Sequence, residues 1–470
     1  PGRALAGFSQ DTRALRPGDV FVALATGKRD GHGFLSAARA AGASAAIVAR
    51  ADASVALPQL VVADPLSAFQ SIAREHRRAF PGAVVAISGS AGKTSTKDLL
   101  ALLLGGAPAV LATEGNLNNH IGVPLTLTRL DAAAHTHAVI EAGISAPGEM
   151  ETLAAMIEPD HGIITLVAPA HTGGLGGVES VAREKSVLLR HVRPGGARLF
   201  PCECLAWPAF AGLAAGGTVV EEIPHPEIPS GRDGRPGHSA LPNPQETSKP
   251  ESPKCPKAGG AGGACFYSVE LTAGGAALAF AGGRRFAFRR VTRGMARNAA
   301  LAVILAARLG VSDSQIQSAL LAWRPAKWRG EIRRDARGRL LYLDCYNANP
   351  ASFADALETF HALAPEKEPR LYVLGCMEEL GPDADRHHRA LGAALKMRAQ
   401  DELFITGDHA GAVAEAAMES GADASRIVIF DTKDRVAGRL GDFRGPVFIK
   451  GSRRYALEQA LPGEEKGGAA

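Results

Sequence analysis

The 470-residue sequence has few cysteines, almost no net charge and no long hydrophobic run, and each shortage argues against a class of protein. Its six cysteines include no Cys-x-x-Cys pair, so we expect neither a disulfide framework nor a zinc motif. Lys and Arg total 52 against 48 Asp and Glu, which lacks the concentrated positive charge of a nucleic-acid-binding protein. Free cysteines and the lack of a recognisable secretory signal favour the cytoplasm.

The longest apolar stretch, residues 99–112, is interrupted by Gly105, Gly106 and Pro108. It is also shorter than the roughly 18 residues that a membrane-spanning helix needs, so no membrane attachment is expected. Small molecules are therefore the expected partners, and nucleic acid is not. Glycine (54 residues) and proline (29 residues) are instead abundant, above their usual combined share of roughly 12%.

The hydrophobic patterning predicts an α/β protein of three domains. The first, residues 1–81, is a small mixed α/β domain with short buried strands. In the second, residues 82–328, strands alternate with helices, which predicts a parallel sheet covered by helices on both faces. A segment rich in Pro, Gly and Ser at about 224–264 interrupts it and is expected to be a disordered insertion. The third, residues 329–470, repeats strand and helix like a Rossmann domain.

The most informative segment is a glycine-rich loop between a buried strand at 83–87 and a helix. It ends in Gly-Lys-Thr, but Ile87 stands where a full P-loop has its first glycine, so the loop is a shorter variant. Backbone amides and the helix N-terminus bind an anion, while the lysine reaches the β- and γ-phosphates and the threonine hydroxyl can ligate Mg²⁺. An ordinary glycine-rich turn with an exposed lysine is the alternative, which the strand-loop-helix context disfavours. The expected nucleotide contacts are Gly89, Ser90, Ala91, Gly92, Lys93, Thr94 and Ser95.

Two metal-ligand candidates follow neighbouring predicted strands. Glu141 ends the strand 138–140, and His171 comes just after the strand 163–167. The carboxyl ends of neighbouring strands are where a nucleotide and its metal are held in a parallel sheet. Taken alone, Glu141 would more often be a solvated carboxylate and His171 an ordinary loop histidine. Lys185, on the helix that follows, would by itself be a surface lysine.

Together with several other segments, these residues resemble the Mur ligase family. The resemblance spans nearly the whole chain, with its strings in family order. It is closest to members that join D-alanyl-D-alanine to UDP-N-acetylmuramoyl-tripeptide, which the strings 116–119 and 346–350 distinguish from relatives that add earlier amino acids. The matching strings are 11–13 with 17–24, 30–32, 89–94, 114–119, 121–127, 346–350, 379–381 and 450–453.

The resemblance implies a monomeric, ATP-dependent amide ligase of peptidoglycan precursor synthesis that works through an acyl phosphate and needs Mg²⁺. Lys93 and Thr94 would hold the phosphates and a first Mg²⁺, and Glu141 and His171 would hold a second metal. Lys185 falls where family members carry a lysine carbamylated by CO₂.

Other roles are carried over position by position from the same resemblance. Asn298 matches an adenine contact, and Arg329 and Asp344 match residues that meet ATP when the C-terminal domain closes. Arg329 and Asp344 complete the expected catalytic set, which also contains Lys93, Lys185 and His171. Substrate contacts are expected at Asp11, Thr12 and Arg13 for the uridine nucleotide, at Asn118 and Asn119, and at Asn347, Asn349 and His388 toward the dipeptide.

Three positions depart from the family pattern: His120 replaces a glutamate, Ser145 lies in a string that replaces Ala-Asn-His, and Gly294 replaces a histidine. We therefore expect a divergent member. Two alternatives stay open. One is a related ligase that adds a different amino acid, and the other is a nucleotide-binding scaffold of the same fold without turnover.

Overall fold

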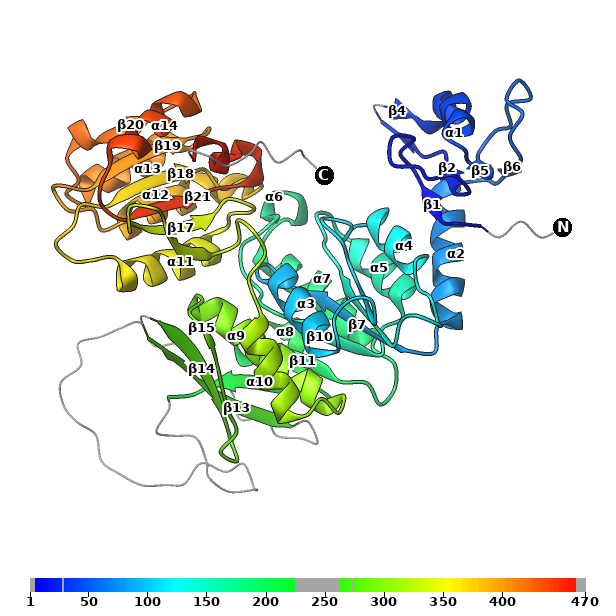
Figure 1. The fold of residues 1–470 in the computed structure, drawn as a ribbon, viewed down its shortest axis with the longest axis horizontal. Helices are drawn as coiled ribbons and strands as arrows, with labels where there is room; N and C mark the ends of the chain where they lie inside the picture. The colour runs from blue at the N-terminus through cyan, green and yellow to red at the C-terminus, as the bar shows by residue number, and fades with distance from the viewer. Residues whose placement is uncertain (1–4, 28, 225–262, 273, 462–470) are drawn as a thin grey trace.

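The computed structural model describes residues 5–27, 29–224, 263–272 and 274–461. The insertion expected at about 224–264 falls almost entirely outside these described residues. The three main sheets, of four, nine and six strands, follow one another along the chain (Figure 1). This agrees with a mixed α/β chain that contains large parallel sheets. Among the helices that the structure describes, none is long and apolar enough to cross a bilayer.

The N-terminal sheet is parallel and has the order β1-β2-β5-β6. Its central strand β2 is buried throughout because Val20, Phe21 and Val22 face apolar side chains on both sides of the sheet. A two-stranded hairpin, β3 and β4, lies beside it. The bounds are β1 (Phe8–Ser9), β2 (Val20–Val22), β3 (Ala25–Thr26), β4 (Arg29–Asp30), α1 (Leu35–Ala40), β5 (Ala45–Val48), β6 (Gln59–Val61) and α2 (Pro65–Ala79).

The middle sheet is built around β7 (Ala83–Ser88), with the order β15-β14-β13-β12-β11-β10-β7-β9-β8. Alternate residues of β7 enter different cores: Val85 and Ile87 face α3, α9 and α10, whereas Val84 and Ala86 face α4, α5 and α7. A strand buried on both faces explains its continuous apolar run. Strands β8 to β13 are parallel, and β14 and β15 add an antiparallel edge that the alternation of strands and helices alone does not predict.

The remaining bounds of the middle domain are α3 (Lys93–Leu103), β8 (Val110–Ala112), α4 (Gly122–Leu127), β9 (His137–Glu141), α5 (Glu149–Ile157), β10 (His161–Ile164), α6 (Thr172–Leu175), α7 (Val178–Arg190), β11 (Arg198–Pro201), α8 (Pro208–Ala211), β12 (Thr218–Glu222), β13 (Ala264–Leu271), β14 (Gly275–Phe280), β15 (Arg285–Arg289), α9 (Arg293–Arg308) and α10 (Asp313–Ala322).

The C-terminal sheet has the order β16-β17-β21-β18-β19-β20 and is parallel except for β16. Helices α11, α12 and α13 cover one face and α14 covers the other, as in a Rossmann-like domain. The bounds are β16 (Glu331–Arg334), β17 (Leu340–Asp344), α11 (Pro350–Leu363), β18 (Leu371–Gly375), α12 (Ala384–Ala394), β19 (Glu402–Thr406), α13 (Ala410–Glu419), β20 (Ile427–Ile429), α14 (Lys433–Asp442) and β21 (Val447–Lys450).

Helix α2 connects the first two sheets and packs against both. It begins at the N-cap Asp64, whose carboxylate accepts hydrogen bonds from the next turn, and Pro65 occupies its first position. Phe69 packs into the core of the N-terminal sheet, whereas Ala73 and Phe80 pack into the core of the middle domain. A boundary at residue 81 therefore cuts through packing that α2 shares with the middle domain.

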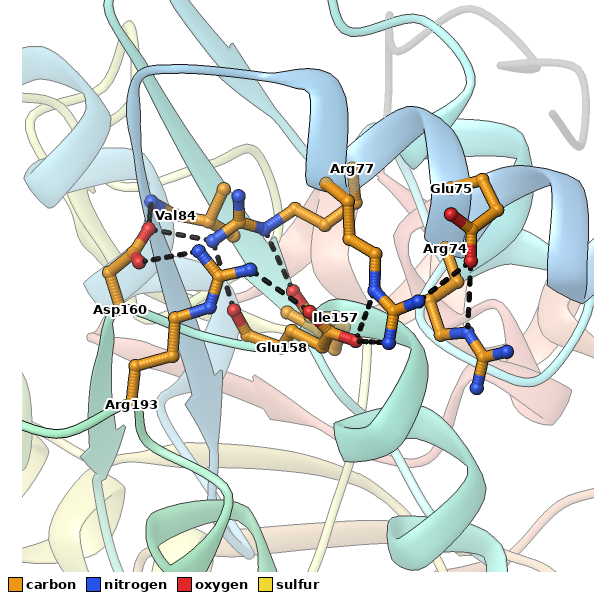
Figure 2. Close-up of polar contacts among 9 residues, drawn as sticks. Arg74, Glu75, Arg77, Val84, Ile157, Glu158, Asp160 and Arg193 are labelled. Carbon is orange, nitrogen blue, oxygen red and sulfur yellow. Dashed lines mark hydrogen bonds and ion pairs between the residues drawn. The ribbon is translucent and has the colours of Figure 1, made fainter.

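Arg77, on α2, fastens this helix to the middle domain (Figure 2). Its side chain is 0% exposed, and its guanidinium donates to the carbonyl oxygens of Ile157 and Glu158, both at 2.9 Å. It also donates to Asp160 Oδ2 at 2.7 Å, and that same oxygen accepts from the backbone N–H of Val84 at 2.7 Å. Asp160 therefore connects α2 to the start of strand β7, and its carboxylate balances the buried charge of Arg77.

Replacing Asp160 with Asn is expected to lower the free energy of unfolding of the middle domain by about 2 kcal/mol, because the buried guanidinium loses its charged acceptor. Urea unfolding followed by tryptophan fluorescence measures this, since Trp207 and Trp323 lie in that domain. Glu75→Gln, which removes the charge from an exposed ion pair with Arg78, is the matched control and should leave the midpoint unchanged. Equal midpoints for Asp160→Asn and wild type would contradict this role.

Candidate functional site

A cavity of about 810 Å³ lies at the carboxyl ends of β7, β9 and β10, where the middle and C-terminal domains meet. Residues from both domains line it. This places most of the expected site residues around one space, although they are up to 259 positions apart in sequence. Those lining it are Ser90, Ala91, Gly92, Lys93, Thr94, Ser95, Asn118, Asn119, Glu141, His171, Asn298, Arg329, Asp344, Asn347 and Asn349.

The glycine-rich loop is held tightly against the end of β10. A Cβ atom on Gly89, whose φ is +150°, would lie 1.9 Å from Thr165 Oγ1. The Thr165 hydroxyl donates to the carbonyl oxygen of Ala91 at 2.6 Å, and the N–H of Ser90 donates to the carbonyl of Leu166 at 2.8 Å. The sequence predicts a strand through 167, but β10 ends at Ile164 because the following residues turn to hold this loop.

The first turn of α3 follows directly from the loop. Its N-cap is Gly92, which has a φ of +80° and supplies no capping side chain, so the first amides of the helix are left for a ligand. A Cβ atom on Gly92 would lie 1.9 Å from Asn298 Nδ2, which places the Asn298 amide against the loop. The loop, the helix N-terminus and Asn298 therefore surround one corner of the cavity.

Two lysines lie beside the loop, Lys93 half-buried and Lys185 buried. Lys93 Nζ donates to the carbonyl oxygen of Gly89 at 2.8 Å, and burial lowers the pKa of Lys93, opposed by the nearby Glu141 carboxylate. Lys185, on α7, is only 2% exposed, and it has no hydrogen-bond or ion-pair partner within the part of the chain that the structure describes. Burial holds the pKa of Lys185 well below its usual value, and the charge of Lys93 adds to this effect.

Glu141, at the end of β9, is the carboxylate of this site and is only 2% exposed. Its Oε2 accepts from the Thr94 hydroxyl at 2.8 Å, and its Oε1 accepts from Asn118 Nδ2 at 2.8 Å. Both carboxylate oxygens are thus oriented by neighbouring side chains. Asn118, expected at the substrate, here positions Glu141.

The C-terminal domain contributes side chains to the opposite wall. The Arg329 guanidinium lies over the ring of Tyr346, 3.8 Å from its centroid, and Asp344 is paired with Lys450. Asn349 caps α11 through Ser352 and donates from Nδ2 to the carbonyl oxygen of Ser90 at 3.0 Å. Asn349 therefore connects the C-terminal domain directly to the glycine-rich loop.

A second connection between the domains involves His171, which has a φ of +56°. Its Nδ1 is hydrogen-bonded to the carboxylate of Glu379, which follows β18 in the C-terminal domain. Beside this pair, Thr172 Oγ1 donates to the carbonyl oxygen of Leu380 at 2.9 Å. Burial lowers the pKa of His171, and the Glu379 carboxylate opposes this shift.

Some expected site residues lie elsewhere. His388 does not face the cavity: its side chain is 0% exposed, Nδ1 donates to the carbonyl oxygen of Ala384 at 2.7 Å and Nε2 accepts from the N–H of Met377 at 2.9 Å. It cannot contact a dipeptide in this arrangement, because both ring nitrogens are engaged. It supports the loop after β18 instead.

The N-terminal triplet also lies away from this cavity. The Asp11 carboxylate accepts from Arg13 Nε at 2.9 Å, and this ion pair with Arg13 lowers the pKa of Asp11 to about 2. These residues and Thr12 form a turn after β1, so a role with the uridine nucleotide stays a prediction.

Sequence reasoning missed several cavity residues, and one of them is Asp355 on α11. Its Oδ1 accepts from the N–H of Gly294 at 2.8 Å, and burial raises the pKa of Asp355. A Cβ atom on Gly294 would lie 2.6 Å from Asp355 Oδ2, so any side chain at position 294 would require Asp355 to move. Glycine at 294 therefore suits this contact, and no local sequence pattern signals it. His120 and Ser145, the other departures, line the cavity.

A parallel-sheet domain with a phosphate loop after its central strand, met by a Rossmann-like domain across a shared cavity, defines an α/β protein built to bind a phosphorylated ligand between two domains. Two family descriptions match the corresponding parts of the chain. Residues 87–209 match "Mur ligase middle domain", and residues 328–452 match "Mur ligase, glutamate ligase domain".

Similar proteins extend this match to nearly the whole chain. The sequence is 30% identical to the UDP-N-acetylmuramoyl-tripeptide–D-alanyl-D-alanine ligase of Synechocystis sp., covering 88% of this chain and 82% of that protein. It is 29% identical to the ligase of the same name from Escherichia coli, covering 97% and 93%. The chain belongs to the Mur ligase family.

Solved structures agree in fold. A crystal structure of MurF from Acinetobacter baumannii superposes with a TM-score of 0.78 at 26% identity, covering 98% of this chain and 93% of that one. MurF from Thermotoga maritima, determined in complex with ADP, gives a TM-score of 0.73 at 22% identity, covering 97% and 96%. The three-domain arrangement is therefore that of known MurF structures.

Lys93→Ala is expected to leave the fold intact, to weaken ADP binding by about 2 kcal/mol, roughly 30-fold, and to abolish turnover, because it removes the ammonium that is expected to bind the phosphates. Titration calorimetry measures the binding, and circular dichroism checks the fold. Lys433→Ala, which removes an exposed lysine bonded to Gln459 in the C-terminal domain, is the control. Wild-type affinity and rate in Lys93→Ala would refute the phosphate role.

Proposed function

We propose that this protein is the ATP-dependent ligase that joins D-alanyl-D-alanine to UDP-N-acetylmuramoyl-tripeptide, a step of peptidoglycan precursor synthesis. The observation that carries the proposal is the shared cavity: Lys93, Thr94 and Glu141 lie on one wall, and Arg329 and Asp344 of the C-terminal domain lie on the other. Relatives of that name match the chain over most of its length.

The reaction has two steps. The terminal carboxylate of the tripeptide attacks the γ-phosphorus of ATP, and the bond from that phosphorus to the bridging oxygen breaks. The products of this step are an acyl phosphate and ADP. The amine of D-alanyl-D-alanine then attacks the acyl carbon, phosphate departs with the bonding pair, and the nitrogen loses its extra proton as the amide forms. Such chemistry depends on alignment and charge neutralisation more than on a strong base.

The chain's own residues supply those requirements. The α3 amides and Lys93 would bind the phosphates, and a phosphate oxygen would replace the Gly89 carbonyl as acceptor for Lys93 Nζ. Arg329 would bring a second positive charge from the C-terminal domain, where Asp344 is also expected at the nucleotide. Asn298, against the loop, would contact the adenine.

The residues present fit Mg²⁺. Thr94 Oγ1 and Glu141 Oε2 are oxygen atoms that can ligate a metal, and they lie 2.8 Å apart. Mg²⁺ prefers oxygen ligands from one or two protein groups plus the phosphates of its substrate. Within the described ranges no three His, Cys, Asp or Glu side chains form a metal-binding group. Thr94, Glu141 and His171 would hold Mg²⁺, which neutralises developing phosphate charge.

Lys185 is suited to carbamylation. Burial and the charge of Lys93 lower its pKa, which favours the uncharged amine, and that is the form that attacks CO₂. The product carries a negative charge, which would offset the positive charge of Lys93 nearby.

The direct test is phosphate release by the purified protein with ATP, Mg²⁺, UDP-N-acetylmuramoyl-tripeptide and D-alanyl-D-alanine. We expect release that requires both peptide substrates and yields the pentapeptide product by mass spectrometry. No release from folded protein would support a scaffold instead. Release with a single amino acid in place of the dipeptide would support a related ligase.

Lys185→Ala is expected to lose most phosphate release, and millimolar acetate or formate should restore part of it, because a small carboxylate can occupy the space of the carbamate. Initial rates with and without the acid measure this. Wild-type enzyme and Lys93→Ala, treated with the same acid, are the controls and should not gain activity. Undiminished activity of Lys185→Ala without added acid would count against carbamylation.

A further inference from the structure

The middle and C-terminal domains meet closely where the start of α6 touches the turn after β18 (Figure 1). Three hydrogen bonds connect residues 171–173 with residues 379–380: His171 with the Glu379 carboxylate, Thr172 Oγ1 to the Leu380 carbonyl at 2.9 Å, and the Gly173 N–H to the Glu379 carbonyl at 3.1 Å. We call this contact the interdomain joint.

The joint is tight enough to demand particular backbones. A Cβ atom on Gly381 would lie 2.8 Å from the Cα of Gly173, so the two backbone segments approach without room for a side chain. His171 and Glu379 both have left-handed backbones, with φ of +56° and +62°. Such conformations are unfavourable in non-glycine residues and persist where the surroundings require them. Both partners of the central pair are therefore held in conformations that an incidental surface contact does not need.

The contact also decides which nitrogen of His171 is free. Glu379 accepts from Nδ1–H, so Nε2 keeps its lone pair. The same ring lines the 810 Å³ cavity on one side and a second cavity of about 340 Å³, also lined by Glu379, on the other. An imidazole whose Nδ1–H is held by a carboxylate is fixed in tautomer and orientation and is a better ligand through Nε2.

We propose that Glu379 is a positioning residue that fixes the ring of His171, so that the C-terminal domain completes the metal side of an ATP site lying in the middle domain. The inference rests on the proposed function, because it takes His171 to be a metal ligand there. Docking of the C-terminal domain and binding of Mg²⁺ with nucleotide then favour each other, since coupling between two equilibria is reciprocal.

The test measures ADP binding to the full-length protein by titration calorimetry, with and without Mg²⁺. Glu379→Ala should raise the Mg²⁺ concentration needed for half-maximal enhancement of ADP binding about 10-fold or more. ADP affinity without Mg²⁺ should stay unchanged. Glu379→Gln should recover part of the loss, because its amide oxygen still accepts from Nδ1–H. Equal Mg²⁺ requirements in wild type and Glu379→Ala would overturn the proposal.

Two controls separate ring positioning from general loosening. Asp385→Ala removes a carboxylate from another histidine pair of the same domain, with His409 Nδ1 at 2.7 Å, and should change nothing. Thr172→Val removes a neighbouring bond of the joint but leaves the His171–Glu379 pair. If Thr172→Val raises the Mg²⁺ requirement as much as Glu379→Ala does, the pair has no special role and the proposal is wrong.

These measurements need no peptide substrate. A wild-type protein that binds ADP with Mg²⁺ but releases no phosphate with the peptides would overturn the proposed function alone. A wild-type protein that releases phosphate, with a Glu379→Ala variant of unchanged Mg²⁺ requirement, would overturn the positioning role alone.

Discussion

The half-buried ammonium of Lys93 is the constraint on which the rest of the site depends. Removing a charge from water costs several kcal/mol unless an opposite charge or strong acceptor replaces the lost hydration. The chain provides one carbonyl oxygen from Gly89 and a nearby carboxylate, Glu141. Lys185 is buried near Lys93 and adds no negative charge of its own, so an anionic ligand would add to the compensating charge that Glu141 provides. The glycines of the loop, the uncapped N-terminus of α3 and the hydrogen-bonded Glu141 all lie around the same cavity.

Local parts of this arrangement could be predicted from the sequence. The strand, loop and helix around Lys93 lie within about two dozen residues, and their boundaries were predicted to within one or two positions because apolar runs and glycines mark them. Strand β10 was predicted at 163–167 but spans His161–Ile164, because its apolar run continues past Ile164 while its hydrogen bonds turn to the loop. Hydrophobicity indicates that a residue is buried, but it does not distinguish a strand residue from one that, like Leu166, accepts a hydrogen bond from a neighbouring loop.

Contacts between domains could not be predicted in this way. Asp355 is one carboxylate on an ordinary helix, and only the fold brings it to the N–H of Gly294. The positions of Arg329, Asp344 and Asn349 followed from family resemblance, which says that residues share a site without giving their partners. That is why Asn349 was expected at the dipeptide, whereas its amide holds the carbonyl of Ser90. His388 was likewise expected at the dipeptide, but its side chain is buried in the domain core.

Helix α2 has a consequence for where the middle domain can be separated from its neighbour. A fragment that started at β7 would lack the guanidinium of Arg77, which leaves the carbonyls of Ile157 and Glu158 without this donor and Asp160 without its buried cation. It would also expose the apolar surface that Ala73 and Phe80 cover. A fragment of the middle domain that keeps these contacts therefore has to begin at or before Asp64, the N-cap of α2.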